Sequence, residues 1–253
     1  MEELQRQDRG HVRILNLNRP SVSNALSHSL ILQLVRAFGE ADAEADVRAI
    51  VLTSSGDKAF CAGLDLKELS DGTIVAGDLH EERLNLDLAM RRCTKPIVGA
   101  IQGAAVAGGF ELALGCDIRM AGAAARFCDA HLRVGLLPGW GLSQKLPRLI
   151  GPARAKELSL TMRSIGADLA YDWGLVNGIA EGDVRDAAEA IAQRISEHDP
   201  ATVQAYGGLI DRGWELPLEQ AMALEERTAR RWNGSMPLDL IRRRLDPATP
   251  KLP

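Results

Sequence analysis

A single carboxylate, Glu111, lies where the chain could bind and stabilise an anion. It follows Gly108-Gly109, which open an amphipathic segment after an apolar run at 96–101 and a break at Gln102-Gly103. The first turn of a helix offers free backbone N–H groups and the positive end of the helix dipole, and glycine lets a ligand approach the main chain. The sequence therefore predicts an anion site in front of Gly108, although the dipole alone would also favour an acidic residue here.

The other reactive side chains fit no common motif. The loop GAAVAGG is neither GxGxxG nor GxxxxGK[ST], and GLSQK lacks the second glycine of a nucleophile elbow. The four cysteines have no CxxC spacing, and Cys61 has no base beside it in the sequence. No pair of histidines has metal-ligand spacing. These patterns disfavour nucleotide-phosphate, serine-hydrolase, thiol and metal chemistry.

The segments that would position Glu111 alternate between strands and helices. Alternating apolar and polar residues at 12–17 and apolar runs farther on predict strands, and apolar residues at helical spacing predict helices between them. In the order strand, helix, strand, helix, strand, they are 12–17, 30–45, 48–53, 79–93 and 96–101. This order implies parallel strands joined by right-handed crossovers. Farther on, the pattern predicts a last strand ending at Ala180 and helices from Val184 to Trp232, so we expect an α/β domain followed by a helical C-terminal subdomain.

Composition limits the classes of partner. The 253 residues are 46% hydrophobic and 25% charged, which is enough for a sizeable core. The net charge of -4 argues against nucleic-acid binding. No apolar run approaches the roughly 20 residues that span a bilayer, and the start MEELQRQDRGHVRI does not resemble a signal peptide. We therefore expect a soluble, cytoplasmic protein without membrane insertion.

Three blocks of sequence resemble the enoyl-CoA hydratase/isomerase (crotonase) family. They are KAFCAGLDLKEL at 58–69, KPIVGAIQGAAVAGGFELALGCDIRMA at 95–121 and RVGLLPGWGLSQKLPRLIGPARAKEL at 133–158, and ADLAYDWGLVNGI extends the likeness to Ile179. The resemblance implies an α/β crotonase (ClpP-like) fold, with a spiral core of repeated ββα-type units. It also implies an acyl-CoA-binding core at 1–195 and a helical oligomerisation region at 196–253, assembled as a homotrimer or homohexamer.

The resemblance also implies a site for an acyl-CoA thioester. Family members hold the thioester carbonyl between two backbone N–H groups, here those of Leu64 and Gly108, and stabilise an enolate. CoA is expected as part of the substrate, with no permanently bound cofactor. Lys58 and Lys67 match cations that face the nucleotide phosphates, although each could equally be a solvated surface charge. The implied substrate-binding residues are Ala25, Lys58, Ala62, Gly63, Asp65, Leu66, Lys67, Gly109, Pro138 and Gly139.

One position departs from the hydratase pattern. Hydratases of the family carry two glutamates; Glu111 matches the first, and His131 occupies the place of the second. A histidine can exchange a proton near neutral pH, so Glu111 and His131 could divide deprotonation and protonation. The resemblance therefore implies a hydratase-like lyase of fatty acid or related acyl-CoA metabolism with Glu111 as general base/acid and His131 as its partner. The alternatives are an isomerase or other acyl-CoA lyase, or a non-catalytic acyl-CoA-binding protein.

Overall fold

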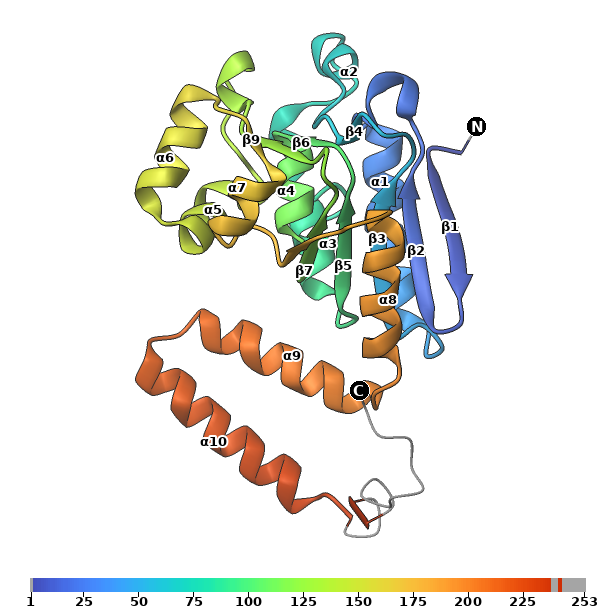
Figure 1. Ribbon diagram of the computed structural model, residues 1–253, viewed down its shortest axis with the longest axis vertical. Helices are drawn as coiled ribbons and strands as arrows, with labels where there is room; N and C mark the ends of the chain where they lie inside the picture. The colour runs from blue at the N-terminus through green and yellow to red at the C-terminus, as the bar shows by residue number, and fades with distance from the viewer. Residues whose placement is uncertain (1, 238–240, 243–253) are drawn as a thin grey trace. The chain divides into compact units, whose positions relative to one another are not determined.

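The computed structural model describes residues 2–237 and 241–242 and contains two β-sheets (Figure 1). The larger sheet has the order β1-β2-β3-β5-β7-β10, and the smaller has the order β4-β6-β8-β9. The strands are β1 (Leu4–Arg9), β2 (Val12–Leu17), β3 (Ala49–Ser54), β4 (Ala59–Cys61), β5 (Ile97–Ile101), β6 (Ala104–Val106), β7 (Ile118–Ala121), β8 (Arg126–Cys128), β9 (Ile165–Gly166) and β10 (Gly178–Ile179).

The chain divides after Pro200 into two compact units, and each of them contains helices. Those of the first unit are α1 (His28–Ala43), α2 (Leu66–Ser70), α3 (Leu86–Arg92), α4 (Gly108–Leu114), α5 (Leu142–Ile150), α6 (Pro152–Thr161), α7 (Ala167–Asp172) and α8 (Val184–Ser196), with short 3-10 helices η1 (Pro20–Val22), η2 (Ala76–His80) and η3 (His131–Val134). None of the helices in the described residues is long and apolar enough to cross a membrane.

Three successive strand–strand–helix units build the region around Glu111. They are β3-β4-α2, β5-β6-α4 and β7-β8-η3, and in each the first strand joins the larger sheet while the second joins the smaller. The Gln102 amide ties two of the corners together, since it donates to the carbonyls of Ser54 and Gly56. Strands β4, β6 and β8 run parallel, so the loops that follow them meet at one edge of the smaller sheet. This is the repeated ββα arrangement that the sequence resemblance predicts.

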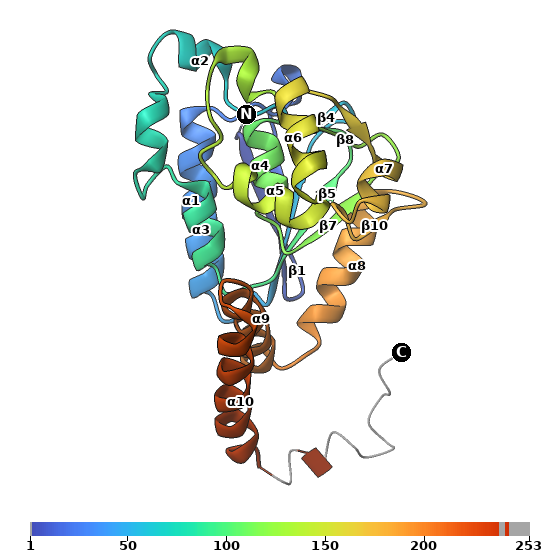
Figure 2. The same cartoon turned by 90° about the vertical axis from the view of Figure 1, so that its left-hand side faces the viewer.

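The larger sheet is covered on both faces, which explains the nearly continuous apolar runs in its strands. Side chains from β2, β3 and β5 alternate between the faces; Figure 2 shows α1 and α3 on one side of the sheet and α8 on the other. The residues packed with α1 and α3 are Leu15, Leu17, Ile50, Leu52, Ile97 and Ile101. Those packed with α8 are Val12, Ile14, Ala49, Val51, Val98 and Ala100.

Helix α3 and strand β1 are two of the elements that differ from the sequence-based expectation. The helix predicted at 79–93 is wrong in its first half, because α3 begins only after Asn85, whose side chain accepts the Leu88 N–H and caps the helix. Strand β1, which pairs antiparallel with β2, was not expected. Only Leu4 of its six residues is buried, so the segment LQRQDR lacks the apolar alternation that identifies a strand.

Within its described residues, the second unit is built from α9 (Pro200–Trp214) and α10 (Leu218–Gly234), which run antiparallel (Figure 1). No residue of either helix is buried. Their large exposed apolar residues are Tyr206, Ile210, Trp214, Leu218 and Met222. Part of the predicted oligomerisation region, at 238–240 and 243–253, lies outside the described residues.

Candidate functional site

Two backbone N–H groups, those of Leu64 and Gly108, belong to loops that touch at the edge of the smaller sheet. A Cβ placed on Gly63 would lie 3.2 Å from the Gly108 nitrogen and 2.9 Å from the Val106 carbonyl oxygen. Across the part of the chain that the structure describes, neither N–H group donates a hydrogen bond to a protein acceptor. Two neighbouring donors can therefore serve an oxygen that develops negative charge.

The residue directly before each of these donors has an unusual backbone conformation. Gly63 has φ +88° and Ala107 has φ +48°, so both lie in the region that side chains disfavour. Gly109, which the resemblance places among the substrate-binding residues, has a packing role here, because a Cβ on it would lie only 2.0 Å from the Cys61 carbonyl oxygen. Glycine at 109 thus lets the start of α4 pack directly on the end of β4.

The Glu111 carboxylate is buried and held by main-chain donors. Its side chain lies on α4 and is only 2% exposed. Oε1 accepts the Trp140 N–H at 2.7 Å and the Leu142 N–H at 3.3 Å. Oε2 lies 3.4 Å from Nε2 of His131. The loop that leads into α5 therefore fixes one carboxylate oxygen and leaves the other beside the imidazole.

His131 lies between two carboxylates. It begins η3, directly after β8, and its Nδ1 is 2.7 Å from Oδ1 of Asp129. Burial disfavours the imidazolium, but hydrogen bonds to Asp129 and Glu111 and the charges of both carboxylates outweigh it, raising the pKa of His131 to about 9. For Asp129, burial alone would raise the pKa of the carboxyl group. Its hydrogen bonds with His131 and Ser159 outweigh burial and hold that pKa below its usual value. The group can therefore carry Asp129 and Glu111 as carboxylates around a protonated histidine.

Sequence reasoning missed Asp129, Trp140 and Leu142. Asp129 precedes a short turn, where aspartate is common for local reasons, so its identity gives no separate signal. Trp140 and Leu142 contribute only backbone N–H groups, which every residue except proline has. The presence of a glycine-rich loop at 139–141 was the one available hint that the main chain comes close to another group.

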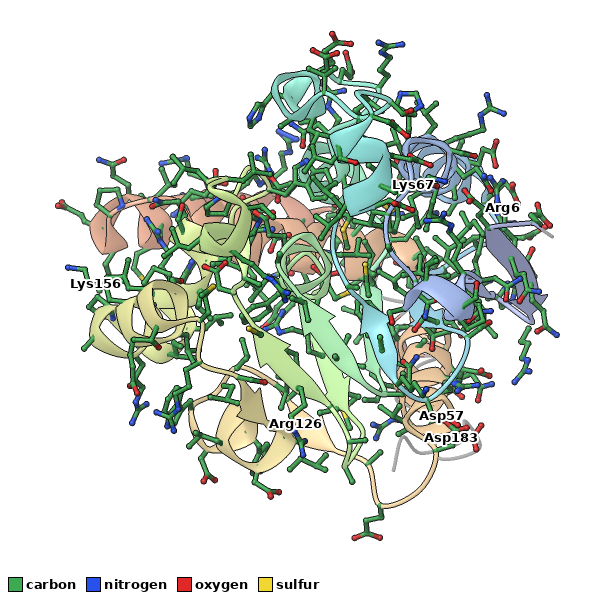
Figure 3. All side chains as sticks on the ribbon, turned by 90° about the horizontal axis from the view of Figure 1, so that it is seen from above. Arg6, Asp57, Lys67, Arg126, Lys156 and Asp183 are labelled. Atoms are coloured by element: carbon green, nitrogen blue, oxygen red, sulfur yellow. The ribbon has the colours of Figure 1, made fainter. Side chains whose placement is uncertain are left out.

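The remaining predicted substrate-binding residues differ in their exposure to solvent. Lys58, Leu66 and Lys67 are exposed, and Figure 3 shows Lys67 on the short helix α2. Ala62 and Pro138 are half-buried, Ala25 is buried and Gly139 is exposed. The Asp65 side chain has structural partners, because it caps α2 and pairs with Arg19.

Cys61 does not have the environment of a reactive thiol. Complete burial at the end of β4 raises the pKa of its thiol to about 12. The thiolate, which is the nucleophilic form, is therefore scarce at neutral pH. This agrees with the sequence, which places no base beside Cys61.

The Asp129–His131–Glu111 group should make stability depend on pH. A histidine whose pKa rises from 6.5 to about 9 on folding stabilises the fold fully below pH 6.5, and this contribution is lost as the pH rises through 9. We expect the free energy of unfolding, measured in urea, to fall across this window by on the order of 3 kcal/mol. His131→Gln should abolish most of this slope, whereas His11→Gln, at an exposed position, should preserve it. Equal slopes in the wild type and His131→Gln would contradict the assignment.

Comparison with known proteins places these features in context. Residues 7–233 match the family described as Enoyl-CoA hydratase/isomerase. The chain is 36% identical over 239 residues to "Probable enoyl-CoA hydratase 1, peroxisomal" of Arabidopsis thaliana, a match that covers 94% of this chain and 89% of the relative. It is 34% identical over 220 residues to a short-chain-enoyl-CoA hydratase of Clostridium acetobutylicum, covering 85% and 84%.

Solved structures of similar proteins confirm the predicted fold class. An enoyl-CoA hydratase from Geobacillus kaustophilus superposes with a TM-score of 0.89 at 29% identity, over 100% of this chain and 98% of that one. An enoyl-CoA hydratase from Bacillus anthracis superposes with a TM-score of 0.83 at 32% identity, over 90% of both chains. The arrangement of sheets and helices described above is therefore shared with enzymes of this name.

Proposed function

The chain belongs to the enoyl-CoA hydratase/isomerase family, and we propose that it adds water reversibly across the double bond of a 2-enoyl-CoA thioester. The observation that carries this proposal is the buried Glu111–His131 pair, in which Oε2 and Nε2 lie 3.4 Å apart. Glu111 belongs to α4, the helix that starts at the free Gly108 N–H group. A base, an acid and a donor for an oxyanion are the three functions that hydration of a conjugated thioester needs.

The Leu64 and Gly108 N–H groups are proposed to bind the thioester carbonyl oxygen. As water attacks C3, the electrons of the C2=C3 bond move toward this oxygen and form an enolate. Donors fixed by the protein fold stabilise that charge without reorganising, and the start of α4 adds the positive end of its backbone dipoles. Each donor of this kind typically contributes about 10²–10³ in rate.

Glu111 and His131 divide the two proton transfers. Glu111 accepts a proton from the attacking water as its oxygen bonds to C3, and the Nε2–H of His131 supplies the proton that C2 gains. Afterwards Glu111 is protonated and His131 is neutral. Transfer of that proton from Oε2 to Nε2 restores both groups. The two atoms face each other at 3.4 Å in the structure, so they must move closer together for direct transfer.

CoA is proposed to enter as part of the substrate, with its nucleotide phosphates near Lys58 and Lys67. Neither lysine forms an ion pair with the described carboxylates. Lys58→Ala and Lys67→Ala should each raise KM for an enoyl-CoA about two- to fivefold, the size of an exposed charge contact, and leave kcat unchanged. The pantetheine thioester of the same acyl group lacks the nucleotide, so its KM should not change.

Lys156→Ala provides the matched control for this charge test. Lys156 is an exposed lysine on α6, and Figure 3 shows it well apart from Lys67. Its removal should leave KM for both substrates as in the wild type. An equal rise in KM for the pantetheine thioester in the Lys67 variant would show that this lysine does not act through the nucleotide.

A direct assay tests the proposed reaction. Purified protein is mixed with 2-enoyl-CoA substrates of several chain lengths, and loss of the conjugated thioester absorbance is followed together with product mass. A product heavier by one water is expected. Formation of 2-enoyl-CoA from a 3-enoyl-CoA substrate, without added water, would assign the chain to isomerisation instead. Tight binding without conversion of either substrate would favour an acyl-CoA-binding protein.

We also propose a homotrimer or homohexamer in the cytoplasm. The absence of buried residues in α9 and α10 supports assembly, because the large apolar side chains of both helices are exposed in the isolated chain. Light scattering on the purified protein should give three or six times the chain mass of 27.3 kDa. A monomer at micromolar concentration would contradict this assembly.

A further inference from the structure

We propose that Asp129 is a positioning residue that fixes which nitrogen of His131 faces the reaction and keeps that nitrogen protonated. The inference rests on the proposed function, because it assigns the origin of the proton that C2 receives. Asp129 itself lies behind the imidazole, on the side away from Glu111, and is not assigned any contact with substrate.

The geometry gives each nitrogen of His131 a different partner. Nδ1 is 2.7 Å from Oδ1 of Asp129, and Nε2 is 3.4 Å from Oε2 of Glu111. An ionised carboxylate only accepts hydrogen bonds, so Nδ1 must carry a proton and donate it to Asp129. The second nitrogen, Nε2, is then the one that can gain or lose a proton on the side of Glu111.

Asp129 is itself held in place by several donors. Its side chain is 5% exposed, and Oδ1 also accepts the backbone N–H of His131 at 3.3 Å. Ser159, which lies on α6, hydrogen bonds to the same carboxylate. Because these contacts come from two different elements, Asp129 can orient the imidazole without moving toward it.

Two carboxylates are the charged groups that act on the His131 ring among the described residues. Asp129 directly follows β8 and Glu111 lies on α4, whereas Ser159 on α6 is neutral. Two carboxylates on opposite sides favour the imidazolium. The histidine at this position can therefore donate a proton at neutral pH, whereas a glutamate would be an effective donor only if its own proton were retained.

Nitrogen NMR of the His131 ring tests the proposal without substrate. In the wild type, both ring nitrogens should be protonated at pH 7, and deprotonation near pH 9 should leave the neutral form with its proton on Nδ1. Signals that disappear in His131→Gln identify the ring. A neutral form with its proton on Nε2 would overturn the proposal, and this result needs only the wild-type protein, so it does not depend on how any variant folds.

Asp129→Asn adds the kinetic test. The amide carries no charge, so deprotonation of the ring should move to lower pH, and the alkaline limb of the kcat profile should move with it. We expect kcat for hydration to fall about 10²–10⁴-fold with little change in KM, as for a histidine that loses its orienting carboxylate. Asp172→Asn, an exposed aspartate at the end of α7, should leave both the NMR titration and kcat unchanged.

The two assays separate this inference from the proposed function. If the wild type hydrates no enoyl-CoA, the proposed reaction fails, while the NMR titrations still decide whether Asp129 controls the proton on His131. If hydration occurs but the ring titrates identically in the wild type and Asp129→Asn, the proposed reaction stands and the role of Asp129 is overturned.

Discussion

Glu111→Gln should lower kcat for hydration of a 2-enoyl-CoA by about 10²–10⁴-fold, with a much smaller change in KM. The amide cannot accept the proton of the attacking water. The fold should persist, because the oxygen of the new amide can still accept the Trp140 and Leu142 N–H groups that bind Oε1 in the wild type. With its oxygen so placed, the NH₂ group of this amide faces Nε2 of His131, and two donors then oppose each other unless the imidazole loses its proton.

The measurement pairs steady-state hydration with circular dichroism to confirm folding. Glu82→Gln is the control, since Glu82 is an exposed carboxylate with a surface partner, Arg92, outside the site. It should keep wild-type kcat. Wild-type activity in Glu111→Gln would exclude Glu111 as the base, and a rise in KM alone would assign it to substrate binding. Loss of activity in both variants would indicate a general effect on the fold rather than on proton transfer.

The reactive side chains of the site can be recognised by residue type, whereas main-chain donors are anticipated only where the family resemblance supplies them, as for Leu64 and Gly108. Glu111 and His131 are chemically distinctive, and the structure places their side chains within 3.4 Å of one another. The N–H groups of Trp140 and Leu142 hold the carboxylate through the main chain, which leaves no trace in residue type. Asp129 lies at a turn, where aspartate is common, so its role becomes visible only in the structure, in which the turn into η3 brings the carboxylate back to the histidine.

The same distinction applies to the fold. Strand β2 was predicted from the alternation of apolar and polar residues at 12–17, and β5 from the apolar run at 96–101. Strands β4, β6 and β8 have three residues each, which is too short for a periodic pattern, yet their parallel pairing sets the edge at which the site lies. Their existence depends on contacts between distant segments, such as the corner that Gln102 ties to Ser54.

Gly63→Ala should separate the two proposed oxyanion donors and lower kcat by about 10²–10³-fold. The new Cβ would lie 2.9 Å from the Val106 carbonyl oxygen and 3.2 Å from the Gly108 nitrogen, both of which are main-chain atoms. The loop after β4 must therefore move away from the start of α4, and the Leu64 N–H moves with it. Glu111 and His131 lie on other elements, so their own contacts should persist.

Gly72→Ala separates this effect from the cost of placing a side chain at positive φ. Gly72 has φ +82° and Gly63 has φ +88°, but a Cβ on Gly72 would meet no atom within 4 Å. Both variants should lose about 1 kcal/mol of unfolding free energy from the backbone conformation, and Gly63→Ala should lose a further ~1–3 kcal/mol from the close contacts. Only Gly63→Ala should lose kcat. If the two variants lose equal stability and both keep wild-type kcat, the junction of β4 and α4 does not form the oxyanion site, and the thioester carbonyl must be bound elsewhere.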